Sequence, residues 1–493
     1  MNHNPPMRRG YVLLALMMTM MLAAMDSTIV STSIPEIVSE LGGFAKFSWV
    51  FSAYLLAQTI TISLYGKLAD IYGRKKIMVV GVTIFLFGSA ACASSWNIDS
   101  LIFFRVVQGL GAGSILASVN TIAGDIYTLE ERGKIQGWLS SVWGVSAIVG
   151  PAIGGALTAY INWRWIFIIN LPVGILSLFF LGVHLREALV SRRPAIDYLG
   201  AVLILLSVGL FIVYLLEGGQ RWPWFGKTGL ALLATTLVLA TLMVRVERAA
   251  AEPILPPWIW RNRTLVFTNL SMVFMGIVMM GPETFLPTFA QAALGLGIIA
   301  SGFVLATMSI GWPIASGYSA KVYMRIGFRN ASLIGALLLV LACVGFLFIP
   351  RPQSIPLLVL DQLLLGAGFG LLSTPALVGA QSIVGWEQRG VVTGLVIFTR
   401  NLGQSLGAAI FGAIFNNSFQ RQMSHAPVAM REGLTDILHV LKEPGIPVAK
   451  RAFLREAINL STHHIYIGLS LFAILALFAI CLMPARIERA GGE

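Results

Sequence analysis

The sequence predicts an all-α polytopic membrane protein, and two observations support this fold class. The 493 residues are 57% hydrophobic and only 11% charged, whereas a soluble domain typically carries about 25% charged residues. The apolar residues also gather in runs of about 20, the length with which an α-helix crosses the hydrocarbon layer of a bilayer. These runs lack the two-residue alternation of a membrane β-barrel. Lipid is therefore the expected solvent for most of the chain.

Fourteen apolar runs of this length follow one another, and each predicts one transmembrane helix. They lie at about 11–33, 48–69, 77–95, 100–123, 135–159, 165–183, 199–217, 228–247, 265–290, 296–319, 330–349, 355–378, 391–415 and 464–483. An even number of spans places both termini on the same side. The segments on that side hold roughly 20 Lys and Arg residues, against about five in the short loops opposite. Because cytoplasmic loops carry the excess of basic residues, we expect both termini in the cytoplasm.

The distribution of charged and reactive residues argues against several classes of function. The net charge of +12 comes from the short loops, so no nucleic-acid partner is expected. The three cysteines lie inside apolar runs and the six histidines form no H-E-x-x-H pattern, so we expect no metal and no cofactor. Gly226-Lys227-Thr228 resembles the end of a P-loop, but Arg221 stands where its first glycine should be. A membrane-embedded enzyme and a sensor are alternatives from other classes, and no nucleophile–base spacing or output domain supports either.

Two pairs of segments resemble each other across the chain. Leu101–Gly113 (LIFFRVVQGLGAG) is similar to Leu358–Gly370 (LVLDQLLLGAGFG), and Gly66–Arg74 has a looser counterpart in Gly317–Arg329. Paired bundles around a central site are the architecture of alternating-access transporters. The repeats therefore predict two six-helix bundles related by pseudo-two-fold symmetry, with two inserted helices between them.

The predicted division of the chain follows from these repeats. The expected parts are an N-terminal bundle at 1–190, the inserted helices at 191–262, and a C-terminal bundle at 263–493 with a long outer loop at about 416–463.

Ionisable residues inside the spans are candidates for function, because a charge in a bilayer is costly. Asp26 lies about two-thirds along the first span and is the first candidate for a proton or cation site, since its carboxyl group can alternate between protonated and charged forms. The alternative is a carboxylate at the wet outer end of the helix. Arg105 is the only formal charge in the middle of the fourth span and needs a water-lined cavity or an acceptor. Its alternative role is structural, holding backbone carbonyls.

Three further charged residues lie within the second half of the chain. Glu283 follows Gly281 and Pro282, which would break the helix there, and is either a second acidic site or an interfacial residue. Asp361 is a similar but less favoured candidate, closer to the outer surface. Arg400 is expected to snorkel toward the cytoplasmic surface.

Glycines mark two further candidate elements. Gly150 and Gly154 recur at a four-residue spacing on one helix face, with Gly155 beside them and Pro151 expected to bend the span. This stretch suits a hinge between bundles, although simple close packing explains it as well. After the second span, Gly66 permits close backbone approach, and Asp70 can meet a helix N-terminus.

Five motifs, in order, resemble the fourteen-helix drug:proton antiporter branch of the major facilitator superfamily. They are Asp26–Pro35 in the first span, Gly66–Lys76 (GKLADIYGRKK) after the second, Arg105–Gly113 in the fourth, Gly144–Gly155 (GVSAIVGPAIGG) in the fifth, and Trp163–Pro172 at the sixth. The resemblance extends over nearly the whole chain.

This resemblance implies export of small amphipathic or cationic drugs in exchange for protons, by alternating access, across a bacterial inner membrane. It implies that Arg105 acts in proton movement through a nearby carboxylate, that the stretch from Gly144 is characteristic of antiporters, and that Asp70, Gly73 and Arg74 latch the bundles on the cytoplasmic side near Gly390. A periplasmic adaptor protein is a further candidate partner. Some relatives carry an acidic residue in the span that holds Arg400, so a purely dicationic substrate range is in doubt.

Two other transport functions stay open at this point. One is a dedicated proton-driven exporter of a single physiological metabolite, siderophore or lipid. The other is a proton symporter, against which only the resemblance of the fifth span argues. The sequence does not identify the substrate.

Overall fold

The computed structural model describes residues 9–42, 46–185, 187, 197–219, 221–250, 253–349, 354–424 and 447–485. Within these ranges the chain is helical and contains no β-strand, only an isolated bridge between Gly218 and Trp222. The predicted all-α class is therefore confirmed.

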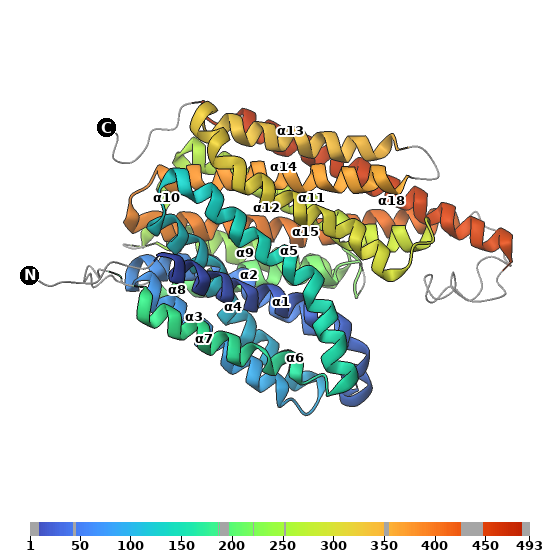
Figure 1. The fold of residues 1–493 in the computed structure, drawn as a ribbon, viewed down its shortest axis with the longest axis horizontal. Coiled ribbons are helices and arrows are strands. Elements are labelled where there is room, and N and C mark those ends of the chain that lie inside the picture. Colours follow the sequence, from blue (N-terminus) through green and yellow to red (C-terminus); the bar gives the residue numbers. More distant parts are fainter. Residues whose placement is uncertain are drawn as a thin grey trace, which may run out of the picture.

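The first six long helical segments pack together as one bundle (Figure 1). They are α1 (Arg9–Leu41), α2 (Phe47–Tyr72), α3 (Arg74–Ala93), α4 (Ile98–Ile126), α5 (Leu129–Tyr160) and the pair α6 (Trp165–Ile168) and α7 (Asn170–His184). Within this bundle α4 packs between α2 and α3, and α1 contacts α5 and α7.

The last long helices form a second bundle with the same arrangement. They are α11 (Arg263–Ala292), α12 (Ile298–Ile326), α13 (Phe328–Leu347), α14 (Ile355–Ser382), α15 (Arg389–Ser424) and α18 (Val448–Cys481); the short α10 (Pro257–Arg261) precedes them and a 3₁₀ turn, η2 (Trp386–Gln388), precedes α15. Here α14 packs between α12 and α13, as α4 packs between α2 and α3.

Glycines explain why the two repeated segments occupy equivalent places. In α4, a Cβ added at Gly109 would lie 2.4 Å from a backbone oxygen of α2, and one at Gly111 would lie 2.4 Å from the backbone of α3. In α14, the corresponding Gly366 and Gly368 lie in the same way against α12 and α13. Any larger residue at these positions would separate the backbones, so the repeated glycines set the central helix of each bundle.

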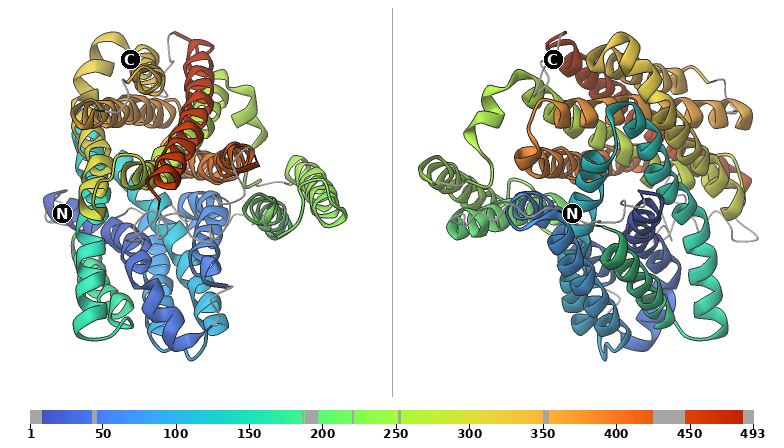
Figure 2. Two further views of the ribbon diagram at one scale, coloured as in Figure 1. Left: turned by 90° about the vertical axis from the view of Figure 1, so that its right-hand side faces the viewer. Right: turned by 60° about the vertical axis from the view of Figure 1, so that its left-hand side comes forward.

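Two helices lie outside these bundles. α8 (Tyr198–Glu217) and α9 (Lys227–Ala249) pack on each other, and α8 contacts α2 and α15. Figure 2 shows this pair, in green, beside the rest of the molecule. The residue boundaries predicted at 190 and 262 stay a prediction.

Eleven helical segments in the described chain are long and apolar enough to cross a membrane, which supports the polytopic class. α2, α12 and α15 are also at least 26 residues long but are not among the eleven. Polar residues reduce their apolar content, as Gln58 and Thr61 do in α2 and Arg400 does in α15. The count of fourteen spans therefore stays a prediction.

The predicted loop at 416–463 differs from what the structure shows. α15 continues to Ser424 and α18 begins at Val448, so much of this stretch is helical. The two extensions pack together, with Gln422 Nε2 donating to the Ala457 carbonyl at 3.2 Å. α15 and α18 contact each other, and Leu454 in the extended part of α18 is fully buried, so this part of the helix is packed against the protein. Residues 425–446 lie outside the described residues.

The two bundles meet along two seams at one end of the molecule, which we call the latch end. One seam joins α2 to α15 and the other joins α5 to α12. In Figure 1 the ribbons of the bundles come together at this end and separate toward the opposite one. Both described chain ends lie here, since Tyr127 Oη donates to the Arg9 carbonyl and Arg329 Nη2 donates to the Cys481 carbonyl.

The stretch of α5 predicted to be a hinge contributes to one of these seams. A Cβ at Gly144 would lie 2.8 Å from the Ser309 carbonyl oxygen of α12, whereas one at Gly150 would lie 2.1 Å from Thr28 Oγ1 of α1. Gly154 is buried, but a Cβ at Gly155 would meet nothing within 4 Å. α5 runs through Pro151 as one helix from Leu129 to Tyr160. The glycines of α5 thus contact both bundles, and the hinge role itself stays a prediction.

We predict that Gly144→Ala destabilises the conformation seen here. The new methyl group would press on a backbone oxygen, and overpacking of this kind costs about 1–3 kcal/mol. The population should shift toward a state in which α5 and α12 are apart at the latch end. Pulsed electron paramagnetic resonance measures this, with spin labels at Lys134→Cys and Arg325→Cys and with the exposed Cys481 replaced by Ser.

Gly155→Ala is the matched control, because its methyl group would enter open space. The distance between the labels should lengthen in Gly144→Ala and stay unchanged in Gly155→Ala. Equal distance distributions in the two variants would contradict the role given to the α5–α12 seam.

Candidate functional site

A fully buried ion pair lies inside the N-terminal bundle. Arg105 Nη1 of α4 lies 2.5 Å from Asp26 Oδ2 of α1, and neither side chain is exposed. The guanidinium also lies over the ring of Tyr54, with Cζ 4.1 Å from the ring centroid, and Arg105 Nε donates to the Val50 carbonyl at 3.0 Å. The structure thus brings together two residues that the sequence singled out separately. Asp26 lies in the bundle interior and not at a wet helix end.

Neutral polar groups complete the surroundings of Asp26. Gln108 Nε2 donates to Asp26 Oδ1 at 2.8 Å, and Gln108 Oε1 accepts from Arg105 Nη1 at 2.8 Å. Asn170 Nδ2 of α7 is 3.4 Å from the same carboxylate oxygen and 2.9 Å from Ser89 Oγ of α3. The carboxylate is therefore held directly by side chains of two other helices, α4 and α7, and Ser89 of α3 supports the two amides that contact it.

Two polar atoms next to the pair have no partner. Arg105 Nη2 and Tyr54 Oη are both buried and form no hydrogen bond. Removing one member of a buried ion pair typically costs about 3–5 kcal/mol, because it leaves the other charge uncompensated. The pair is consequently sensitive to any event that neutralises Asp26, and protonation is such an event.

The residues predicted to form a latch do meet the start of α15. Asp70 Oδ1 accepts from the Gly390 N–H at 2.9 Å, and Asp70 Oδ2 accepts from the Val391 N–H at 2.8 Å. A carboxylate at a helix N-terminus satisfies free N–H groups and interacts favourably with the helix dipole. Gly66 permits this approach, since a Cβ there would lie 2.5 Å from the Gly390 carbonyl oxygen.

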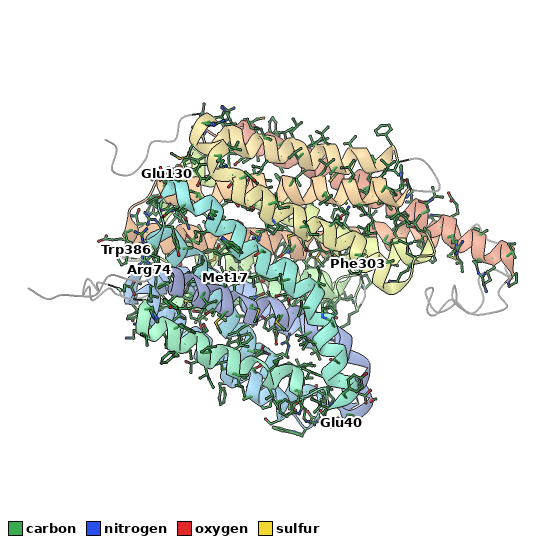
Figure 3. The ribbon with its side chains drawn as sticks, in the orientation of Figure 1. Met17, Glu40, Arg74, Glu130, Phe303 and Trp386 are labelled. Carbon is green, nitrogen blue, oxygen red and sulfur yellow. The ribbon has the colours of Figure 1, made fainter. Side chains whose placement is uncertain are left out.

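Arg74 extends the latch to a third element. Its Nη2 contacts Asp70 Oδ1 at 2.6 Å, and its guanidinium carbon lies 3.7 Å from the centre of the Trp386 ring. Gly73 has φ 95°, a conformation that favours glycine, and it turns the chain directly from α2 into α3. Figure 3 shows Arg74 and Trp386 side by side at the latch end, with Glu40 at the opposite end.

Sequence reasoning missed the acidic residue at the centre of this network. Asp125, at the end of α4, accepts from Arg74 Nε at 3.0 Å and from Arg389 Nη1 at 2.6 Å. Since Arg389 begins α15, Asp125 joins the N-terminal bundle to the C-terminal one. A lone charge at the end of the fourth span was the only signal in the sequence that could have indicated it.

The opposite end holds a separate ion pair outside the apolar part of α1. Glu40 accepts hydrogen bonds from Arg164 Nη1 at 2.5 Å and from Trp163 Nε1 at 2.7 Å. These two donors, Arg164 first, lower the pKa of Glu40 below its ordinary value. The motif that begins at Trp163 therefore ties the loop between α5 and α6 to the end of α1.

A cavity lies between the two bundles and is lined by residues from α4, α5, α11, α12, α14 and α15. Its lining comprises Asn120, Gln136, Ser140, Met272, Trp312, Ser373, Thr374, Leu377, Val396, Ile397 and Arg400. Amide, hydroxyl and apolar groups thus surround one formal charge, that of Arg400. The expected snorkelling of Arg400 is wrong, because the side chain lines this cavity and its Nε is buried.

The other two acidic candidates do not join Asp26. Glu283 is half-buried in α11 and forms no hydrogen bond or ion pair with another described residue, and Arg400 is the cation whose charge acts on it. α11 continues through Pro282, so the expected break is wrong; membrane helices accommodate proline by local adjustment. Asp361 is buried in α14 and accepts one hydrogen bond, from Gln362 Nε2 at 2.9 Å.

No group of three or more His, Cys, Asp and Glu side chains suited to a metal ion occurs among the described residues.

Comparison with known proteins places this geometry in a family. Residues 16–408 match the model of the Major Facilitator Superfamily. Among curated relatives, Multidrug resistance protein 3 of Bacillus subtilis is 34% identical over 424 residues, covering 85% of this chain and 82% of its own length. Multidrug transporter protein MdtP of the same organism is 31% identical over 518 residues, covering 99% and 95%.

A solved structure supports the fold. The human organic anion transporter MFSD10 superposes with a TM-score of 0.63 at 17% identity, covering 97% of this chain and all of that one. The extent of the family match and the two bacterial relatives identify the family: this chain belongs to the Major Facilitator Superfamily of membrane transporters.

Proposed function

We propose that this protein is a proton-coupled antiporter that exports small drug-like compounds by alternating access. The observation that carries the proposal is the fully buried pair of Asp26 and Arg105. The printed names of the bacterial relatives, which are multidrug transporters, support the substrate class. An exporter dedicated to one metabolite would use the same pair, and a panel of different drugs distinguishes it from a multidrug exporter.

Protonation of Asp26 is the coupling step in this proposal. A proton on the carboxylate removes its attraction for Arg105, and leaves a buried cation without its charged partner. The surrounding amides can turn to donate or accept, since Gln108 and Asn170 carry both kinds of group. Two arrangements of the same cluster, one with a proton and one without, can therefore stabilise two positions of α1 relative to α4.

A short chain of contacts connects this cluster to the other bundle. Thr28, two residues after Asp26, donates from Oγ1 to the Ser146 carbonyl of α5 at 3.0 Å. Gly144, two residues before Ser146, packs on the Ser309 carbonyl of α12. A shift of α1 thus reaches the α5–α12 seam through one hydrogen bond from a side chain to a carbonyl and one backbone contact close to it. We propose this as the mechanical link between proton binding and opening of the latch end.

The closed latch and the separated opposite end fit an outward-facing state. In this proposal the latch end faces the cytoplasm, both termini lie there, and the membrane is the bacterial inner membrane. The bundles are residues 1–190 and 263–493, joined by the inserted helices at 191–262. Glu283 is a candidate second acidic site, and Asp361 is the less favoured one.

We predict that Asp26→Asn abolishes substrate-driven proton movement. The amide keeps the shape of the carboxyl group but cannot bind and release a proton in the working range. Purified protein is reconstituted in vesicles with an imposed proton gradient and a pH dye inside. Cationic, neutral and acidic drugs are then added in turn. Wild type should release protons on addition of substrate, and Asp26→Asn should not.

Two further variants keep this test decisive. Because Asp26→Asn leaves Arg105 uncompensated, the double variant Asp26→Asn with Arg105→Gln restores neutrality and should fold, yet lack coupling. Asp99→Asn is the control, since Asp99 forms an exposed pair with Lys46. Proton release that persists in the double variant would place the coupling site elsewhere. No response of wild type to any compound would contradict multidrug export and favour a dedicated exporter.

We predict that Asp70→Asn opens the latch end. The substitution removes the charge that pairs with Arg74 and one of the two oxygens that accept from α15. The loss of such charged hydrogen bonds costs about 1.5–3 kcal/mol, which is roughly tenfold or more in population. A thiol at Thr393→Cys, buried behind the latch, reports this through its rate of reaction with a polar maleimide.

The same Asp99→Asn substitution serves as control, because exposed ion pairs contribute little to stability. The labelling rate should rise about tenfold in Asp70→Asn and stay unchanged in Asp99→Asn. Equal rates in both variants would show that Asp70 does not hold the bundles together.

A further inference from the structure

The central cavity contains a cation without a partner. Arg400 lines it from α15, its Nε is buried without a hydrogen bond, and no ion pair or hydrogen bond joins its side chain to another described residue. An arginine inside a membrane protein normally pairs with an acid or with backbone carbonyls. The donors of Arg400 are therefore available to something that enters the cavity.

The lining contains no carboxylate that could neutralise this charge. Its other polar groups are two amides, Asn120 and Gln136, and three hydroxyls, on Ser140, Ser373 and Thr374. Part of their hydrogen-bonding capacity is already used, because Gln136 Nε2 donates to Asn120 Oδ1 at 3.2 Å. Glu283 acts on Arg400 only at a distance, without forming an ion pair. The cavity thus presents a net positive site to a ligand.

The position of Arg400 is fixed by its own helix. A Cβ added at Gly276 of α11 would lie 2.1 Å from the Arg400 carbonyl oxygen, so the two helices touch at this residue. The neighbouring Thr399 Oγ1 lies 3.1 Å from Asn269 Oδ1 of α11. A guanidinium on a rigid backbone offers pre-organised, paired N–H donors to a planar anion.

Apolar groups complete the site. Met272, Leu377, Val396 and Ile397 line the cavity together with Trp312, whose ring lies 5.3 Å from that of Phe369. An aromatic surface beside a cation suits a ligand that has a flat apolar body and one acidic group.

We propose that this cavity, about 50 Å³ in the arrangement seen here, widens to bind amphipathic weak acids as anions, with the carboxylate or phenolate of the ligand paired to Arg400 and its apolar body against Trp312. The inference rests on the proposed export function and adds a substrate class to it. A cationic drug would meet uncompensated repulsion from Arg400 in the same place.

Equilibrium binding to the full-length purified protein in detergent tests this proposal without any proton gradient. The probes are 1-naphthoate, its neutral isostere 1-naphthamide, and the cation 1-naphthylmethylammonium. Wild type should bind the naphthoate about tenfold more tightly than the amide, the factor expected from one charge-assisted hydrogen-bonded pair, and bind the cation most weakly. Equal affinity for naphthoate and amide, or a preference for the cation, would overturn the proposal by itself.

Variants of Arg400 locate the effect. Arg400→Gln should lose the preference for the anion while still binding the amide, and Arg400→Lys, which retains the charge, should recover part of it. Lys134→Gln removes an exposed cation outside the cavity and should change nothing. The melting temperature verifies that Arg400→Gln is folded. If this folded variant still binds naphthoate more tightly than naphthamide, or loses affinity for both equally, then Arg400 does not bind the carboxylate of the ligand.

Failure of the anion-binding proposal can be distinguished from failure of the proposed antiport function. Coupling to protons is tested by Asp26 variants in vesicles, whereas anion preference is an equilibrium property of the cavity. Loss of coupling in Asp26→Asn together with no anion preference in wild type would leave antiport intact and reject only the substrate class.

Discussion

The ion pair between Asp26 and Arg105 is the constraint on which the functional account depends. Both charges are fully buried, and the other hydrogen-bond partners of Asp26 are the neutral amides of Gln108 and Asn170. Such a pair is stable only while both members are charged and hydrogen-bonded. A single proton can therefore change the free-energy balance of the N-terminal bundle by several kcal/mol, the order of the cost of breaking a buried pair.

In the proposed mechanism, the two seams between the bundles would convert that local event into a movement of one bundle relative to the other. At Gly66 and Gly390 the backbones of α2 and α15 touch, and at Gly144 α5 touches α12. Tightly packed backbones are bistable, because a small separation loses contact over the whole seam. Asp125 reinforces the closed arrangement, since it binds Arg74 of one bundle and Arg389 of the other. The central cavity lies between these seams, so the same movement that opens the latch end would change access to Arg400.

Sequence reasoning succeeded where the physical rule is local. Hydrophobic length predicted the helical membrane class, the glycine repeats predicted that α4 and α14 are equivalent, and Asp70 was expected near Gly390, where it lies. It failed where the outcome depends on how helices are rotated. The pairing of Asp125 with Arg389, the direction of the Arg400 side chain and the isolation of Glu283 all depend on tertiary packing between segments far apart in the chain. The helix break expected at Pro282 does not occur, because membrane helices can accommodate a proline by adjustments with their neighbours, and α11 continues through it.

Infrared difference spectroscopy of the purified protein tests the central claim most directly, because it observes the carboxyl proton itself. The account predicts a protonated-carboxyl C=O band that grows as the pH falls, is absent from Asp26→Asn, and weakens at fixed pH when a transported compound binds, since proton and substrate are linked. A band that belongs to another carboxyl group, or an Asp26 that stays ionised at every pH at which transport occurs, would contradict it.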